Sequence, residues 1–516
     1  MIFDLHTHTS LKPFLSRLDP DKKISCWKKI EVCLVIDDIA GDRLDSQSCL
    51  SQMLDGKVTL AVTTLYALER EIANTFLIKL VNFFSLKLSN RLLHRINERK
   101  PGYRYVDLIR GELQNYRKAV NERPGQLVFL KKGDPMDTAS LDGKINVIFA
   151  IEGGHAMLDT ETVEDFDYTD DAQINAVLSR FESLLDENPD ITFSHLTPAH
   201  IARSIFCNQV FAFPNFNEKC STENFLPRSI IGINKAGWRL IEKCREKNIL
   251  IDIKHMSYAS RCQYYKYLRD NGITVPIIAS HMGVAGIAFG EVKKLWTILA
   301  EFKNCYNIQV HRPQGLMDTV FSPLTINLFD EEIKFIVDAC GLIGLSLEER
   351  ILGYVKGDDI YDLEYIYTEE YNNLLTGSYN IDYGFLGAMA DGSTYLTVAS
   401  AAYPKSDDMI DIHTKYFCNN VLRIVYAGGA NAWNCICIGS DYDGLIVAIK
   451  SCKTADQFEN FRLKVLYWLP IMIKTVDNYG AIFYVDESDF ENDIKQKVDK
   501  IMFENGHRFF VNFLAS

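Results

Sequence analysis

Eight apolar, β-branched runs recur along the chain, and each one ends abruptly in polar residues. The runs are Ile2–His8, Val58–Leu65, Ile145–Gly153, Ile191–His195, Ile249–His255, Val275–His281, Gly341–Leu347 and Cys435–Asp441. They lack the polar alternation of an exposed sheet, which is typical of parallel strands that are covered on both faces. The chain therefore contains the strands of a buried, mainly parallel sheet, and this limits it to α/β architectures.

Segments with helical periodicity separate these runs. Lys235–Lys247 carries apolar residues on one side and is followed at once by the apolar stretch Ile249–Ile253. Strand, helix and strand at this spacing are the signature of a parallel βαβ unit. Eight such strands in 516 residues predict a (β/α)8 TIM-type barrel of the α/β class.

Three connections are longer than a minimal barrel needs, near residues 69–144, 284–340 and 353–429. The second and third are rich in Tyr, Asp, Asn and Gly at their centres, which predicts loop and short-helix insertions over the active-site face. The candidate functional residues run from position 6 to position 441, so we expect a single barrel domain over residues 1–516.

The composition disfavours two classes of partner. A net charge of −13 argues against binding to nucleic acid, which needs clustered Lys and Arg. The most apolar helical stretch, Phe76–Leu88, is broken by Lys79, Asn82 and Lys87, so we expect no membrane span. The thirteen cysteines form no CxxC pair and no signal peptide is visible, which predicts a cytoplasmic protein.

Six of the eight apolar runs end in His, Glu or Asp, and the carboxyl ends of barrel strands meet at one face. His6 and His8 are two residues apart, so on an extended strand both imidazoles point to the same side and can hold one metal ion. Glu152 ends a buried run with no adjacent Lys or Arg, and such a carboxylate needs a cation or hydrogen bonds. The alternative for Glu152 is a cap of the next helix.

His255 and His281 end the fifth and sixth runs and extend the candidate ligand set. Histidine and carboxylate ligands without thiolates suit Zn²⁺, and they also accept Mn²⁺ or Co²⁺. Asp441 is the first charged residue after the apolar stretch Cys435–Ile438, and a carboxylate there can move a proton between metal-bound water and a leaving group. Alternatively, Asp441 is a turn residue. We expect a turn at Asp443-Gly444.

With these residues, the chain resembles the membrane dipeptidase (renal dipeptidase, peptidase family M19) branch of the amidohydrolase superfamily. The resemblance rests on five segments in the family's order: His6–Phe14, Ile151–Ala156, Asp252–Ser257, Ser280-His281 and Gly439–Gly444. It implies two divalent metal ions, for which we expect zinc. His6, His8 and Glu152 would hold one ion, and Glu152 would bridge to a second ion held by His255 and His281.

The resemblance also implies the roles of residues that hold no metal. Asp441 would transfer the proton, and His195 would match the family histidine that polarises the substrate carbonyl. His200, five residues on, is the rival for that role. The implied reaction is hydrolysis of the amide bond in a dipeptide or dipeptide-like small molecule, with a hydroxide shared by the two ions as the nucleophile. Family members are commonly dimers, so the resemblance allows a homodimer.

Two departures from the family pattern concern charge. The better-known dipeptidases have Asp where this chain has His8, which should leave the first metal more positive. They also carry an Arg after the strand-six histidine that receives the terminal carboxylate of the substrate. In this chain Met282–Lys294 contains no Arg, and its only basic residues are Lys293 and Lys294. The missing Arg alone predicts only a small difference in kcat/KM between a dipeptide and its C-terminal amide. Arg203 and Arg350 both follow barrel strands, and either could replace the missing Arg.

Two alternatives remain at the level of sequence. Phosphoesterases of the polymerase and histidinol phosphatase type also open with a strand bearing His-x-His-Thr. The chain lacks their Ser-Asp-Gly continuation after His8, and its Glu-Gly-Gly-His stretch fits the dipeptidases better. A catalytically silent binding barrel is the second alternative, because a fold does not imply an activity. The complete set of five ligands together with Asp441 argues against it.

Overall fold

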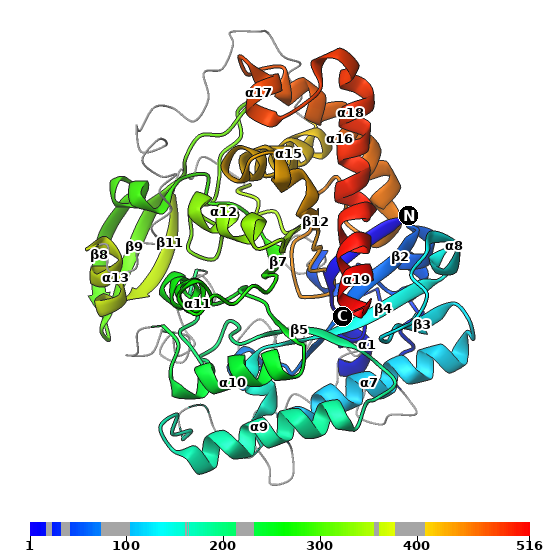
Figure 1. Cartoon of the computed structure of the whole chain (residues 1–516), viewed down its shortest axis with the longest axis vertical. Coiled ribbons are helices and arrows are strands. Elements are labelled where there is room, and N and C mark those ends of the chain that lie inside the picture. Colours follow the sequence, from blue (N-terminus) through cyan, green and yellow to red (C-terminus); the bar gives the residue numbers. More distant parts are fainter. Residues whose placement is uncertain are drawn as a thin grey trace.

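Eight parallel strands form a barrel surrounded by helices (Figure 1). The computed structural model describes residues 1–16, 23–31, 42–73, 104–159, 163, 165–212, 226, 232–354, 361–376 and 408–515. The barrel strands are β1 (Ile2–Thr7), β2 (Val58–Tyr66), β4 (Ile145–Glu152), β5 (Phe193–Thr197), β6 (Leu250–Ile251), β7 (Ile278–Met282), β10 (Leu342–Leu345) and β12 (Ile436–Ile438). Each of the eight predicted runs overlaps one of these strands.

The strands follow the order β6-β5-β4-β2-β1-β12-β10-β7. The first and last strands of this order meet at a parallel bridge between Asp252 and Ile278, where the backbone N–H of Ile253 donates to the Ile278 carbonyl at 2.9 Å. A short ninth strand, β3 (Leu127–Phe129), pairs with the start of β4. The predicted (β/α)8 TIM-type fold is confirmed.

Amphipathic helices pack around the barrel. The longer ones are α7 (Tyr105–Glu122), α9 (Asp171–Asp186), α10 (Lys235–Glu246), α11 (Tyr258–Asp270), α12 (Asp330–Asp338), α15 (Met409–Gly428), α16 (Phe458–Ile473) and α18 (Phe490–Asp499). The helix predicted at Lys235–Lys247 is α10, which buries Leu240 and Cys244 on its apolar side. Its first turn is capped by the side chain of Asn234, which accepts from the Gly237 N–H.

The last helix, α19 (Asn505–Ala515), closes one end of the barrel. Phe510 and Leu514 of α19 pack with Phe3, Leu5 and other interior side chains near the amino ends of the strands. The rings of Phe3 and Phe510 have their centroids 5.7 Å apart. Since this end is filled by apolar side chains, the polar strand ends collect at the opposite, carboxyl end.

A second, three-stranded antiparallel sheet lies apart from the barrel strands (Figure 1). It consists of β8 (Trp296–Phe302), β9 (Cys305–His311) and β11 (Tyr361–Tyr367), in the order β11-β9-β8. The interpretation of 284–340 and 353–429 as loops and short helices was therefore wrong for these segments, which also contain α12 and α15. The β8–β9 turn uses Lys303 and Asn304 at positive φ, and without a glycine it gives little signal in sequence.

Part of the predicted first insertion also has regular structure. Helix α7 falls within 69–144, whereas the apolar stretch Phe76–Leu88 lies outside the described residues. In the part of the chain that the structure describes, no helix combines the length and the apolar character that a bilayer crossing requires. The single-domain and homodimer expectations stay predictions.

Candidate metal centre

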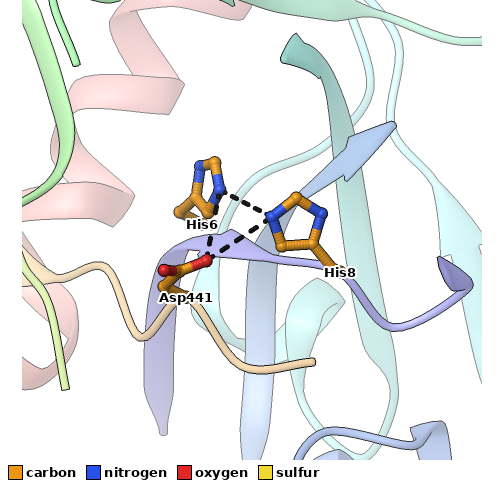
Figure 2. Close-up of side chains that lie close together, drawn as sticks. All are labelled: His6, His8 and Asp441. Carbon is orange, nitrogen blue, oxygen red and sulfur yellow. Dashed lines mark hydrogen bonds and ion pairs between the residues drawn. The ribbon is translucent and has the colours of Figure 1, made fainter. Parts of the chain in front are cut away.

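Side chains from the carboxyl ends of the barrel strands converge on one site. His6 and His8 leave the end of β1, and Asp441 follows β12 and faces them, as Figure 2 shows. The Nε2 atoms of His6 and His8 are 3.0 Å apart, and Asp441 Oδ1 lies 3.9 Å and 3.5 Å from them, respectively. The two imidazoles thus share one side of the strand end, as the spacing predicted.

Glu152, the last residue of β4, occupies the middle of the site. Its carboxylate lies 3.2 to 3.7 Å from the Nε2 atoms of five histidines, although only 1% of the residue is exposed. The five are His6, His8, His200, His255 and His281. Four of them come from the predicted ligand set, so the structure brings together all five residues of that set.

The fifth histidine, His200, is the predicted rival of His195. Its Nε2 lies 3.7 Å from Glu152, and its Nδ1 lies 2.8 Å from Glu69, which follows β2. His200 also lines the cavity above the site. His195 is buried in β5, with its Nδ1 3.0 Å from Ser194 Oγ, and is not among the residues that line this cavity.

Neighbouring polar groups orient the ligand rings. His6 Nδ1 lies 3.2 Å from Thr64 Oγ1, and His281 Nδ1 lies 2.8 Å from Ser280 Oγ. Hydrogen bonds of this kind fix the tautomer and direction of a ligating imidazole, which leaves Nε2 free for a metal. His255 and Asp441 have left-handed backbone conformations, with φ of 63° and 61°, and such strained positions concentrate at functional sites.

Burial and the central carboxylate set opposite protonation states around the site. Burial lowers the pKa of His6 and His281, and it lowers the pKa of His255 to about 3. Burial also disfavours the charged form of His8, but hydrogen bonds to Asp441 and Glu152 outweigh it and raise the pKa of His8 to about 10. Three ligands are therefore neutral and ready to coordinate, whereas His8 must release a proton when a cation binds.

The carboxylates respond to the same surroundings. Burial raises the pKa of Glu152, but the nearby His200 and the hydrogen bond with His8 outweigh burial and hold it well below its usual value. The pKa of Glu69 is lowered to about 2 because His200 and His155 outweigh burial. Burial raises the pKa of Asp441, which suits a group that exchanges a proton.

The residues present fit divalent cations. Glu152 Oε1 and His255 Nε2 are buried and have no hydrogen-bond partner among the residues that the structure describes, although each is a good metal ligand. Three groups have ligand atoms within 4.8 Å of one another: His6, His8 and Asp441; His6, Glu152 and His281; and Glu152, His200 and His255. Nitrogen and carboxylate donors without thiolates suit zinc, manganese or cobalt. A buried cluster of this composition is costly without a cation.

A cavity opens above the cluster and carries three cationic side chains, Lys254, Arg43 and Arg350. Arg350 donates from Nε to Glu348 at 2.6 Å. The other predicted candidate, Arg203, does not line this cavity and donates from Nε to the Leu226 carbonyl at 3.0 Å. Of the two arginines that could replace the missing one, only Arg350 therefore reaches the cavity.

Sequence reasoning missed several residues of the site. Glu69 lies three residues beyond the end of β2, and Arg43 precedes α3 (Leu50–Asp55), so neither is at the tip of a strand. Lys254 is adjacent to His255 in the sequence, and this position was the available signal. Burial lowers the pKa of Lys254 to about 8.

No protein-family model matches this chain, and no curated protein matches it by sequence. Two solved structures share its fold over almost the whole length. One is described as dipeptidase AC, a metallopeptidase of family M19; it is 13% identical, the alignment covers 100% of this chain and 99% of that chain, and the TM-score is 0.50. The second is a metallopeptidase from Rhodobacter sphaeroides with a phosphinate mimic of the dipeptide L-Ala-D-Ala, at 13% identity, 99% and 98% coverage and a TM-score of 0.50. At this identity the similarity establishes a common fold.

Proposed function

We propose that this chain is a metal-dependent hydrolase of the M19 type that cleaves the amide bond of dipeptides or dipeptide-like small molecules. The observation that carries the proposal is the position of Glu152, with five histidine Nε2 atoms within 3.7 Å of one buried carboxylate. One carboxylate among so many imidazoles suits a bridge between two cations. The shared fold with structures described as M19 and dipeptide-mimic complexes supports the same class.

We assign two divalent ions, with zinc as the expected metal, to the predicted ligands. His6, His8 and Glu152 would hold one ion, and Glu152, His255 and His281 the other. His200 is a further candidate ligand, since it forms a compact group with Glu152 and His255. When bound, such ions lower the pKa of water toward about 7 and polarise a carbonyl group.

The residues around the ions would handle the substrate and the proton. Asp441 lies 3.5 Å from His8 and has a raised pKa, so it can accept the proton of the attacking water and deliver it to the departing amine nitrogen. For the residue that polarises the scissile carbonyl, the cavity favours His200, held by Glu69, over the predicted His195.

We further propose that the protein works in a reducing, cytoplasmic setting. The eleven cysteines in the described part of the chain are all free, and ten of them are buried. Free thiols in this number are typical of reducing compartments. Fractionation of cells that produce the native protein tests this setting.

The decisive experiment is a substrate screen of the metal-reconstituted protein. L,L-, L,D- and N-acylated dipeptides would be assayed beside simple phosphate esters, with Glu152→Gln as the matched control. We expect dipeptide hydrolysis, about two ions per chain by elemental analysis, and neither property in the control. Hydrolysis of the phosphate esters alone would identify a phosphoesterase, and a folded protein with neither metal nor activity would indicate a binding barrel.

A further inference from the structure

We propose that Lys254 is a specificity-determining residue that binds the carboxylate of the substrate. This inference rests on the proposed function. Lys254 directly precedes His255, lines the cavity above the metal cluster and is only 1% exposed. Its Nζ atom has no hydrogen-bond partner among the described residues. By contrast, the buried Lys12 has its Nζ 2.8 Å from Asp443. A buried, unpaired ammonium is costly unless an anion reaches it.

The acidic groups near Lys254 are engaged elsewhere. Asp252 accepts from two hydroxyl groups, at 2.6 and 2.7 Å, and from backbone N–H groups. Glu348 accepts from Arg350 Nε at 2.6 Å and from two backbone N–H groups. Asp441 lies against the histidines, 3.5 Å from His8. The ammonium of Lys254 therefore remains available to a ligand in the cavity.

The charge balance of the cavity points to an anionic ligand. Among the described residues that line it, the cations Lys254, Arg43 and Arg350 match the carboxylates Glu152, Glu348 and Asp441 in number. Apart from its histidines, this lining is therefore close to electroneutral before any metal binds. Divalent ions would leave an excess of positive charge, which a substrate carboxylate offsets.

Lys254 changes the expectation drawn from the missing arginine. In the segment Met282–Lys294, the side chain of Lys294 is 67% exposed and pairs with Glu291, so it is not directed to the site. Lys254 supplies a buried positive charge instead, as a point charge without the two-pronged geometry of a guanidinium. We therefore expect clear discrimination in favour of a free carboxylate, in place of the shallow discrimination that the missing arginine alone predicts.

The test compares a dipeptide with its C-terminal amide in the metal-loaded protein. The variants are Lys254→Met, Lys254→Arg and the matched surface control Lys294→Met, with metal content measured for each. In the wild type and in Lys294→Met, we expect kcat/KM for the acid to exceed that for the amide by at least about tenfold, the lower end for a charge-assisted hydrogen bond. In Lys254→Met the ratio should fall to about one through loss on the acid alone, and Lys254→Arg should keep a preference.

Calorimetric binding of alanine and alaninamide to the same metal-loaded proteins gives a readout that does not depend on turnover. We expect alanine to bind the wild type more tightly than alaninamide, and Lys254→Met to lose that difference. If no dipeptide is hydrolysed but this binding pattern is found, the proposed function fails and the role of Lys254 stands. An unchanged acid-to-amide preference in Lys254→Met, with its metals retained, overturns the role of Lys254.

Discussion

Replacing Glu152 with Gln removes the one negative charge that all candidate ligands surround. Unit charges about 4 Å apart interact by about 4 kcal/mol at an effective dielectric constant near 20. Five histidine nitrogens lie within 3.7 Å of this carboxylate, so a cation held among them lies close to the charge that is lost. Since 1.4 kcal/mol corresponds to a factor of ten, we expect metal affinity to fall by at least about a thousandfold, together with activity.

Chelator competition followed by elemental analysis measures this loss, with circular dichroism as the check on folding. Glu348→Gln is the matched control, because Glu348 is a buried carboxylate of the same cavity and belongs to none of the three candidate ligand groups. Its metal affinity should stay close to that of the wild type. Two tightly bound ions in Glu152→Gln would refute the reasoning that this carboxylate bridges them.

Three further substitutions test other parts of the molecule. Asp441→Asn should retain the metals and lower turnover by at least about 10²-fold in steady-state assays, and near-normal turnover would make it a turn residue only. Glu332→Gln should lower the free energy of unfolding in urea by about 3–5 kcal/mol, because it breaks a fully buried pair with Arg261, and a loss below 1 kcal/mol would contradict this. Burial raises the pKa of Glu364, which accepts from Thr325, to about 7, so the folded state binds the proton more tightly than the unfolded state. The stabilisation by the protonated Glu364 carboxyl is therefore complete below the unfolded pKa of 4.5 and is lost as pH rises through about 7. In Glu364→Gln, the free energy of unfolding should depend less on pH over this range. An unchanged pH dependence of unfolding would contradict the raised pKa.

Much of the barrel could be predicted from local sequence patterns. A strand buried on both faces must be apolar along its length, so each run is visible without knowledge of its neighbours. Polar residues at the ends of such runs are equally visible, which is why His6, Glu152 and His281 could be selected together. The closed barrel then places strand ends that are far apart in the chain at one face.

The small antiparallel sheet could not be predicted in this way. Strand β8 is exposed at every residue after Trp296, β9 is only partly buried, and β11 joins them from a distant part of the chain. Pairing between such segments depends on their three-dimensional neighbours more than on intrinsic preference. The sequence therefore indicated an insertion at these positions without indicating its structure.

The sequence by itself determined the barrel and the carboxyl-end face where the candidate ligands gather, because the burial and direction of each strand follow from its local pattern of apolar and polar residues. Only the tertiary structure decided which side chains from the loops reach that site. His200 meets Glu152 through its contact with Glu69, and Lys254 is buried with no hydrogen-bond partner in the described part of the chain because nearby acids bind other groups. These relations depend on distances between residues remote in sequence, and no local pattern encodes such distances.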